Sequence, residues 1–169
     1  MIDAALAAHR EQQSSGGANP SVAPEELKST SSLADWAEEL AVINKTRNVL
    51  EKRLRQMILN FLRSNSLSDK TKPSAKDRIL ACAQSERRKA LAPSSADDLI
   101  EKLYWLELLA IVKKEWSVFS PVFGDLRLFE DNFATANDRP DTHAKDADSL
   151  DIALQRRALK WLSDKMAAI

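Results

Sequence analysis

Apolar side chains recur every three or four positions in one part of this sequence, and this spacing constrains the fold more than any other feature. An arginine at position 47 is the one interruption. Such a heptad seam predicts a long helix over about residues 33–64 that packs one face along a neighbouring helix. Ser32 is the expected N-cap of this helix. The seam consists of Trp36, Leu40, Ile43, Leu50, Leu54, Met57 and Phe61.

The rest of the chain also favours helices. Only 3 of 169 residues are glycine, and Ala, Leu, Glu, Lys, Arg and Gln are plentiful, which is typical of an all-α fold. The sequence therefore predicts an up-and-down bundle of four to five core helices. The helices after the first are expected at residues 75–91, 97–119, 125–136 and 148–167. The 97–119 segment is apolar on nearly all sides, so we expect it to be central.

Residues 14–32 read as a tether, because they are rich in serine and hold two of the three glycines and two prolines. We therefore expect a flexible arm over residues 1–31 and the helical bundle over residues 32–169.

Charge and cysteine content limit the classes of function. The net charge is zero, so any contact with nucleic acid must use a local basic patch. Cys82 is the single cysteine, which predicts a reducing compartment, the cytoplasm, and a small buried side chain. One Cys and two His cannot supply a structural zinc site, so neither a metal nor a cofactor is expected. The sequence shows no signal peptide and no apolar run long enough to span a bilayer, so no membrane partner is expected.

Four cations on the first predicted helix, Lys52, Arg53, Arg55 and Arg63, lie mostly off the apolar seam. They are interpreted either as a solvated charged face or as a stripe that contacts phosphates.

One short segment, residues 137–144, gathers the residue types that acid–base chemistry on a phosphate requires. His143 can move protons near neutral pH, and Arg139 can stabilise charge that develops on a phosphate. With a ribose 2′-hydroxyl as nucleophile, the pair could transesterify RNA without a metal ion. Asn137 and Asp141 would support the substrate. The alternative is a polar turn in which Asn137 or Asp141 caps backbone groups.

From about residue 98 to 166 the chain resembles the HEPN superfamily (higher eukaryotes and prokaryotes nucleotide-binding domains). The resemblance rests on the apolar pattern at 99–108, on Trp116, Phe119 and Phe129, and on Asn-x-Arg-x-Asp-x-His-Ala at 137–144. It implies a HEPN-like bundle that often dimerises, and an arginine and a histidine that cleave RNA without metal. Carried over, these are Arg139 and His143. Three residues separate them here, against four to six in the family, and Pro140 stands where the family usually has a polar residue.

Two functions are compatible with these features. The first is an endoribonuclease or RNA-binding protein of a toxin–antitoxin or anti-phage system that acts as a homodimer. The second is a non-catalytic helical module that dimerises, or docks on a protein partner such as an antitoxin or a larger defence or NTPase assembly.

Overall fold

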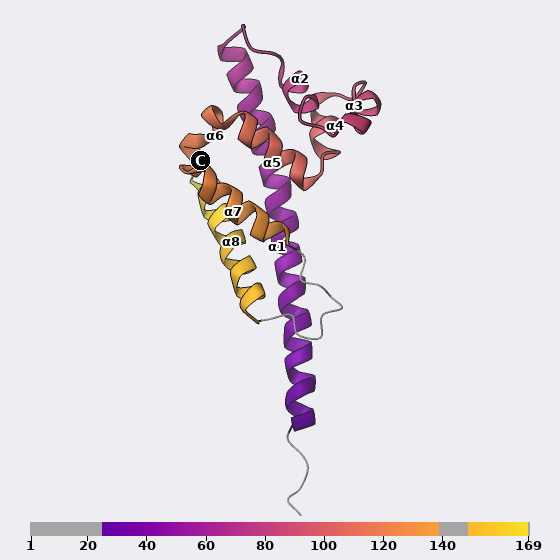
Figure 1. Cartoon of the computed structure of the whole chain (residues 1–169), viewed down its shortest axis with the longest axis vertical. Helices are drawn as coiled ribbons and strands as arrows, with labels where there is room; N and C mark the ends of the chain where they lie inside the picture. The colour runs from indigo at the N-terminus through magenta and orange to yellow at the C-terminus, as the bar shows by residue number, and fades with distance from the viewer. Residues whose placement is uncertain (1–24, 139–148, 169) are drawn as a thin grey trace, which may run out of the picture. The chain divides into compact units, whose positions relative to one another are not determined.

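The computed structural model describes residues 25–138 and 149–168, and these residues form helices and no strand (Figure 1). The predicted all-α class is therefore confirmed for this part of the chain. The chain divides after Trp36 into two compact units, and the second, Ala37–Ile169, contains the packed core. The helices are α1 (Glu25–Ser68), α2 (Ala75–Leu80), α3 (Ser85–Leu91), α4 (Ala96–Glu101), α5 (Trp105–Lys114), α6 (Trp116–Phe123), α7 (Leu126–Asn137) and α8 (Ser149–Ala167).

Helix α1 is the longest helix, as predicted, but the predicted starting point was wrong. The helix begins at Glu25, so Ser32 lies inside it rather than at the N-cap. The sequence Glu-Glu-Leu-Lys at residues 25–28 consists of good helix formers, which favours this earlier start.

The buried face of α1 follows the predicted seam and then turns away from it. Ile43, Leu50 and Leu54 are buried as expected, but the buried positions further along are Ile58 and Leu62 rather than the predicted Met57 and Phe61. A straight α-helix has 3.6 residues per turn and drifts against a repeat of 3.5, so the buried stripe rotates around the helix.

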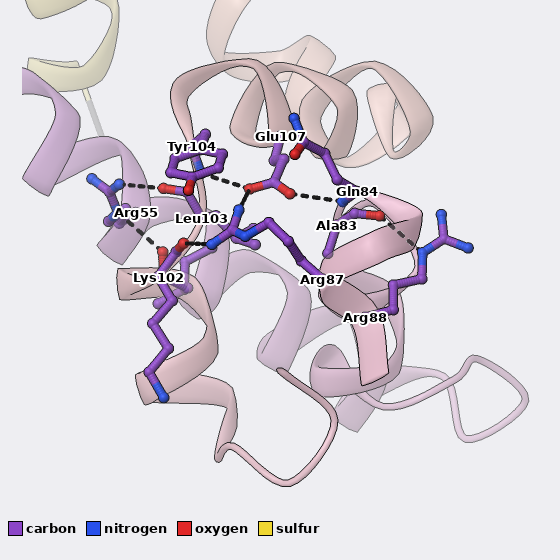
Figure 2. A network of polar contacts seen from close by, with 10 residues as sticks. Arg55, Ala83, Gln84, Arg87, Arg88, Lys102, Leu103, Tyr104 and Glu107 are labelled. Carbon is purple, nitrogen blue, oxygen red and sulfur yellow. Dashed lines mark hydrogen bonds and ion pairs between the residues drawn. The ribbon is translucent and has the colours of Figure 1, made fainter. Parts of the chain in front are cut away.

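The single helix predicted over residues 75–91 was wrong, because the chain turns between α2 and α3. Hydrogen bonds that involve side chains replace the helical ones at this turn (Figure 2). Arg88 donates to the carbonyl oxygens of Ala81 and Ala83, and the backbone N–H of Gln84 donates to the carboxylate of Glu107 at 2.7 Å. Since the freed backbone groups find these partners, the interruption is tolerated.

The single helix predicted over residues 97–119 was also wrong, since it is divided into α4, α5 and α6. At the first break Arg55 donates to the carbonyl oxygens of Ile100 and Leu103, at 3.0 and 2.6 Å. Arg87 donates to the carbonyl oxygen of Lys102 at 2.5 Å (Figure 2). Side chains from α1 and α3 thus satisfy the carbonyls that leave the helical ladder.

Helices α7 and α8 lie side by side and pack extensively against each other (Figure 1). Their interior is aromatic, with Phe129 and Phe133 at 5.3 Å between ring centroids and Phe123 at 4.4 Å from Phe129. The bounds of both helices agree with the predicted 125–136 and 148–167 to within about a residue. Among the described residues, no helix is long and apolar enough to cross a membrane.

Candidate functional site

The structure describes only one of the residues that the sequence nominated for chemistry. Asn137 is the half-exposed last residue of α7. Arg139, Asp141 and His143 lie outside the described residues, so their catalytic role stays a prediction.

The described helices that precede and follow residues 139–148 pack against each other. Phe123 of α6 lies against Trp161, and the carbonyl oxygen of Asp138 accepts a hydrogen bond from Gln155. Helix α8 therefore runs antiparallel to α7, so that the end of α7 and the start of α8 lie at the same end of the pair (Figure 1). Gln155 is only 2% exposed, and its Oε1 has no partner within the described part of the chain.

A furrow runs along α1 and the C-terminal half of α8, and we call it the α1–α8 furrow. It consists of three neighbouring hollows of about 210, 460 and 520 Å³, of which the first two share Arg53 and the last two share Phe61 as lining residues. Its α1 side extends from Lys45 to Ser68, about 35 Å at 1.5 Å per residue. The lining residues are Lys45, Thr46, Val49, Leu50, Lys52, Arg53, Gln56, Met57, Asn60, Phe61, Ser64, Asn65, Ser68, Val118, Pro121, Val122, Ser163, Lys165, Met166 and Ala168.

Helices α1 and α8 are parallel along this furrow. Arg156 pairs with Glu39 at 2.7 Å, whereas Met166 lines a hollow with residues 52–61 and Ala168 lines the next with residues 61–68. Successive turns of α8 therefore face successive turns of α1.

The charge of the furrow has one sign. Its lining includes four cations, Lys45, Lys52, Arg53 and Lys165, and no acidic residue. Two acidic residues close to the furrow in sequence form ion pairs with cations that do not line it. Glu51 pairs with Arg55 at 2.6 Å, and Asp164 pairs with Lys160 at 2.8 Å. A concave surface lined by cations concentrates positive potential, which attracts phosphates.

Of the four cations that the sequence singled out, only two belong to the furrow. Lys52 and Arg53 are exposed and line it. Arg55 is half-buried and bound to Glu51 and to backbone carbonyls, and Arg63 pairs with Asp97 at 2.5 Å. Lys45 and Lys165, which also line the furrow, were not among the cations predicted from the sequence to contact phosphates. The spacing of Lys45, Val49 and Arg53 at steps of four was the available signal on α1, whereas Lys165 is brought in by packing.

Glu107 is a buried carboxylate outside the furrow. It is as buried as a catalytic acid can be, but its oxygens already accept hydrogen bonds from within the protein. It is 3% exposed and accepts hydrogen bonds from Arg87 and from the backbone N–H groups of Gln84 and Tyr104 (Figure 2). The Arg87 guanidinium also lies 3.8 Å from the centre of the Tyr104 ring. With its oxygens engaged by three donors, Glu107 joins segments of the fold rather than offering a proton to a substrate.

Neither Arg78 nor Cys82 has the properties of a catalytic group. Arg78 is buried, pairs with Glu115, and also donates to Asn65 and Ser66. Cys82 is half-buried rather than fully buried as expected, and burial raises the pKa of its thiol. A protonated thiol is a poor nucleophile. Within residues 25–138 and 149–168, no cluster of His, Cys, Asp or Glu could hold a metal ion.

Comparison with known proteins adds no family to this description. The chain matches no protein-family model, no curated protein and no solved structure.

Proposed function

We propose that this chain is an RNA-binding protein with a HEPN-like, up-and-down bundle, and that the α1–α8 furrow holds the RNA backbone. The observation that carries the proposal is the furrow itself, which is about 35 Å long and lined by four cations and no acid. Because the whole chain has no net charge, this local concentration of cations is the kind of patch that nucleic-acid binding requires.

The chemistry of the lining favours the backbone over the bases. Beside the cations it offers neutral hydrogen-bonding groups, including Gln56, Asn60 and Ser64, which suit phosphate and sugar oxygens. Its one aromatic ring, Phe61, is half-buried and already stacks on Phe119 at 5.7 Å between centroids. Binding that depends mainly on phosphates tolerates many sequences and weakens steeply with salt.

Cleavage is the second part of the proposal, and it rests on the HEPN resemblance. His143 accepts the proton of a ribose 2′-hydroxyl, whose oxygen attacks the adjacent phosphorus. The P–O bond to the next nucleotide then breaks, and the departing 5′-oxygen takes up a proton from the protonated histidine, directly or through water, which returns His143 to its neutral form. Arg139 stabilises the added negative charge on the phosphate, and Asn137 and Asp141 support the substrate. The paired motifs of a homodimer would share one cleft.

The salt dependence of RNA binding tests the furrow. Four cations on single-stranded RNA predict a slope of about −3 in a plot of log affinity against log salt. The double variant Lys52→Ala/Arg53→Ala should reduce the steepness of this slope by about 1.4 and weaken binding. The matched control Lys89→Ala/Arg127→Ala removes two exposed cations outside the furrow and should leave the slope unchanged. Fluorescence anisotropy with a labelled RNA oligonucleotide measures both, and equal effects of the two double variants would refute the furrow as the binding site.

A second candidate function, helical dimerisation or docking on a protein partner, is favoured by one observation on α1. Val42 and Val49, seven residues apart and so on one face of the helix, are 57% and 54% exposed. If this face is a dimer interface, Val42→Asp/Val49→Asp should convert a dimer into a monomer in light scattering. A wild-type chain that is monomeric at high concentration would count against this candidate.

A further inference from the structure

A second hollow, of about 620 Å³, lies where α1 ends and α2 begins, and we call it the α1–α2 hollow. It shares no lining residue with the α1–α8 furrow, so a ligand of this hollow would not depend on the proposed function. Its lining consists of Arg63, Ser66, Leu67, Lys70, Lys72, Ser74, Ala75, Lys76 and Ala96.

The α1–α2 hollow combines an apolar group with cations. Leu67 is 80% exposed, the most of any large hydrophobic side chain in the described part of the second unit. Four cations, Arg63, Lys70, Lys72 and Lys76, line the same hollow, and no acidic residue does. Single exposed leucines are common on protein surfaces, but this one borders a hollow whose charged lining residues are all cations, so the hollow offers an apolar contact beside positive charge.

The hollow is preformed, because hydrogen bonds fix the loop that makes its wall. Ser66 donates to the carbonyl oxygen of Pro73 at 2.9 Å, and Lys72 donates to Asn65 at 3.0 Å. The nearby carboxylate of Asp69 accepts from the hydroxyl and the N–H of Thr71, so it turns toward its own loop. Little ordering of this loop is therefore required when a partner binds.

We propose that the α1–α2 hollow docks an acidic segment of another protein that presents one apolar residue between carboxylates. The apolar residue covers Leu67, and the carboxylates pair with the surrounding cations. Charge complementarity selects an acidic partner. Leu67 favours a peptide over a nucleic acid, because an apolar side chain can cover it whereas a sugar–phosphate backbone cannot.

One ion pair within the protein resembles the contact that we propose between the hollow and its partner. Asp97 of α4 pairs with Arg63 at 2.5 Å, and it is the only carboxylate that pairs with any of the hollow's cations among the described residues. A docking carboxylate would compete with Asp97 for Arg63. Replacing Asp97 with asparagine therefore removes a competitor, and binding should tighten by up to about fivefold.

A displayed library of random short peptides, selected on the intact chain, tests the proposal. The expected consensus is an apolar residue with Asp or Glu three or four positions away. Binding of the selected peptide should fall at least about tenfold in Leu67→Ser and in Lys76→Glu. The controls are Leu106→Ser and Lys89→Glu, which alter exposed side chains away from the hollow and should bind normally.

Three results would overturn the proposal. One is a consensus without acidic residues, and another is equal binding by Leu67→Ser and Leu106→Ser. The third is RNA binding that depends on Leu67 and Lys76 while no acidic peptide binds, which would assign the hollow to nucleic acid. Circular dichroism of each variant distinguishes lost binding from lost folding, and Leu67 is too exposed for its loss to unfold the chain.

Discussion

Arg87 donates a hydrogen bond to the buried carboxylate of Glu107 at 2.6 Å, and this contact joins α3 to the first turn of α5. Glu107 also accepts from the backbone N–H groups of Gln84 and Tyr104, both at 2.7 Å. One carboxylate thus accepts hydrogen bonds from the N-cap backbone of both α3 and α5 and from a side chain of α3. Glu107 therefore links the start of α3 to the start of α5, where the backbone hydrogen bonds of a continuous helix are missing.

Glu107→Ala should therefore lower the free energy of unfolding by about 3 kcal/mol, because it leaves Arg87 and two backbone N–H groups without their acceptor. Urea denaturation followed by circular dichroism measures the change. The control is Glu101→Ala, which removes an exposed carboxylate and should change stability by less than about 0.5 kcal/mol. Equal stability of the two variants would show that the network is dispensable.

The same network explains what the sequence could and could not predict about the fold. Periodicity identified the long α1, the separate helices α7 and α8, and the helical content of everything between α1 and α7, but not the packing of α7 on α8. It could not place the breaks after Leu80 and Glu101, because both segments retain helical spacing through the break. The breaks depend on arginines distant in sequence, such as Arg55, which lies 45 residues from the carbonyl of Ile100 that it binds.

Arg53 and Arg55 lie only two positions apart on α1, but we expect Arg53 to bind RNA and Arg55 to stabilise the fold. Arg55→Ala should lower the free energy of unfolding by about 2 kcal/mol, because two backbone carbonyls lose a charged donor. Arg53→Ala should leave stability within about 0.5 kcal/mol of the wild type and weaken RNA binding. Urea denaturation and RNA anisotropy on both variants measure the two effects. Destabilisation by Arg53→Ala would contradict the contrast.

Acid should destabilise the fold partly through Glu115. The hydrogen bond from Arg78 holds the pKa of this carboxyl below its ordinary value of 4.5, against the opposing effect of burial. A lowered pKa in the folded state means that the stabilisation is present above about pH 4.5 and is lost as the pH falls through the folded-state pKa. Glu115→Gln cannot titrate, so its stability should fall less than that of the wild type between pH 7 and acid. Urea midpoints at several pH values measure the difference, and identical pH profiles would show that this pair contributes nothing.

The candidate binding surface was only partly predictable, for a physical reason. Lys52 and Arg53 stand out in the sequence, but so do Arg55 and Arg63, and all four have the same local character. Their roles separate only when tertiary partners appear, with backbone carbonyls for Arg55 and Asp97 for Arg63. The α1–α8 furrow exists because α8 runs parallel to α1, an arrangement that no local pattern of residues determines.

The prediction for chemistry concerns Arg139 and His143. If the chain cleaves RNA, His143→Ala and Arg139→Ala should each abolish cleavage, since general acid–base catalysis is worth about 10²–10⁴ in rate. Both variants should keep the wild-type circular dichroism spectrum and the RNA affinity that the furrow provides. Cleavage should also persist in EDTA, because the proposed mechanism uses no metal ion. Gel assays of mixed RNA with the wild type and both variants, with and without EDTA, measure these effects.

Cleavage that continues unchanged in His143→Ala would remove the histidine from the mechanism. A wild type that binds RNA but never cleaves it would leave the furrow as the functional site and favour the non-catalytic function.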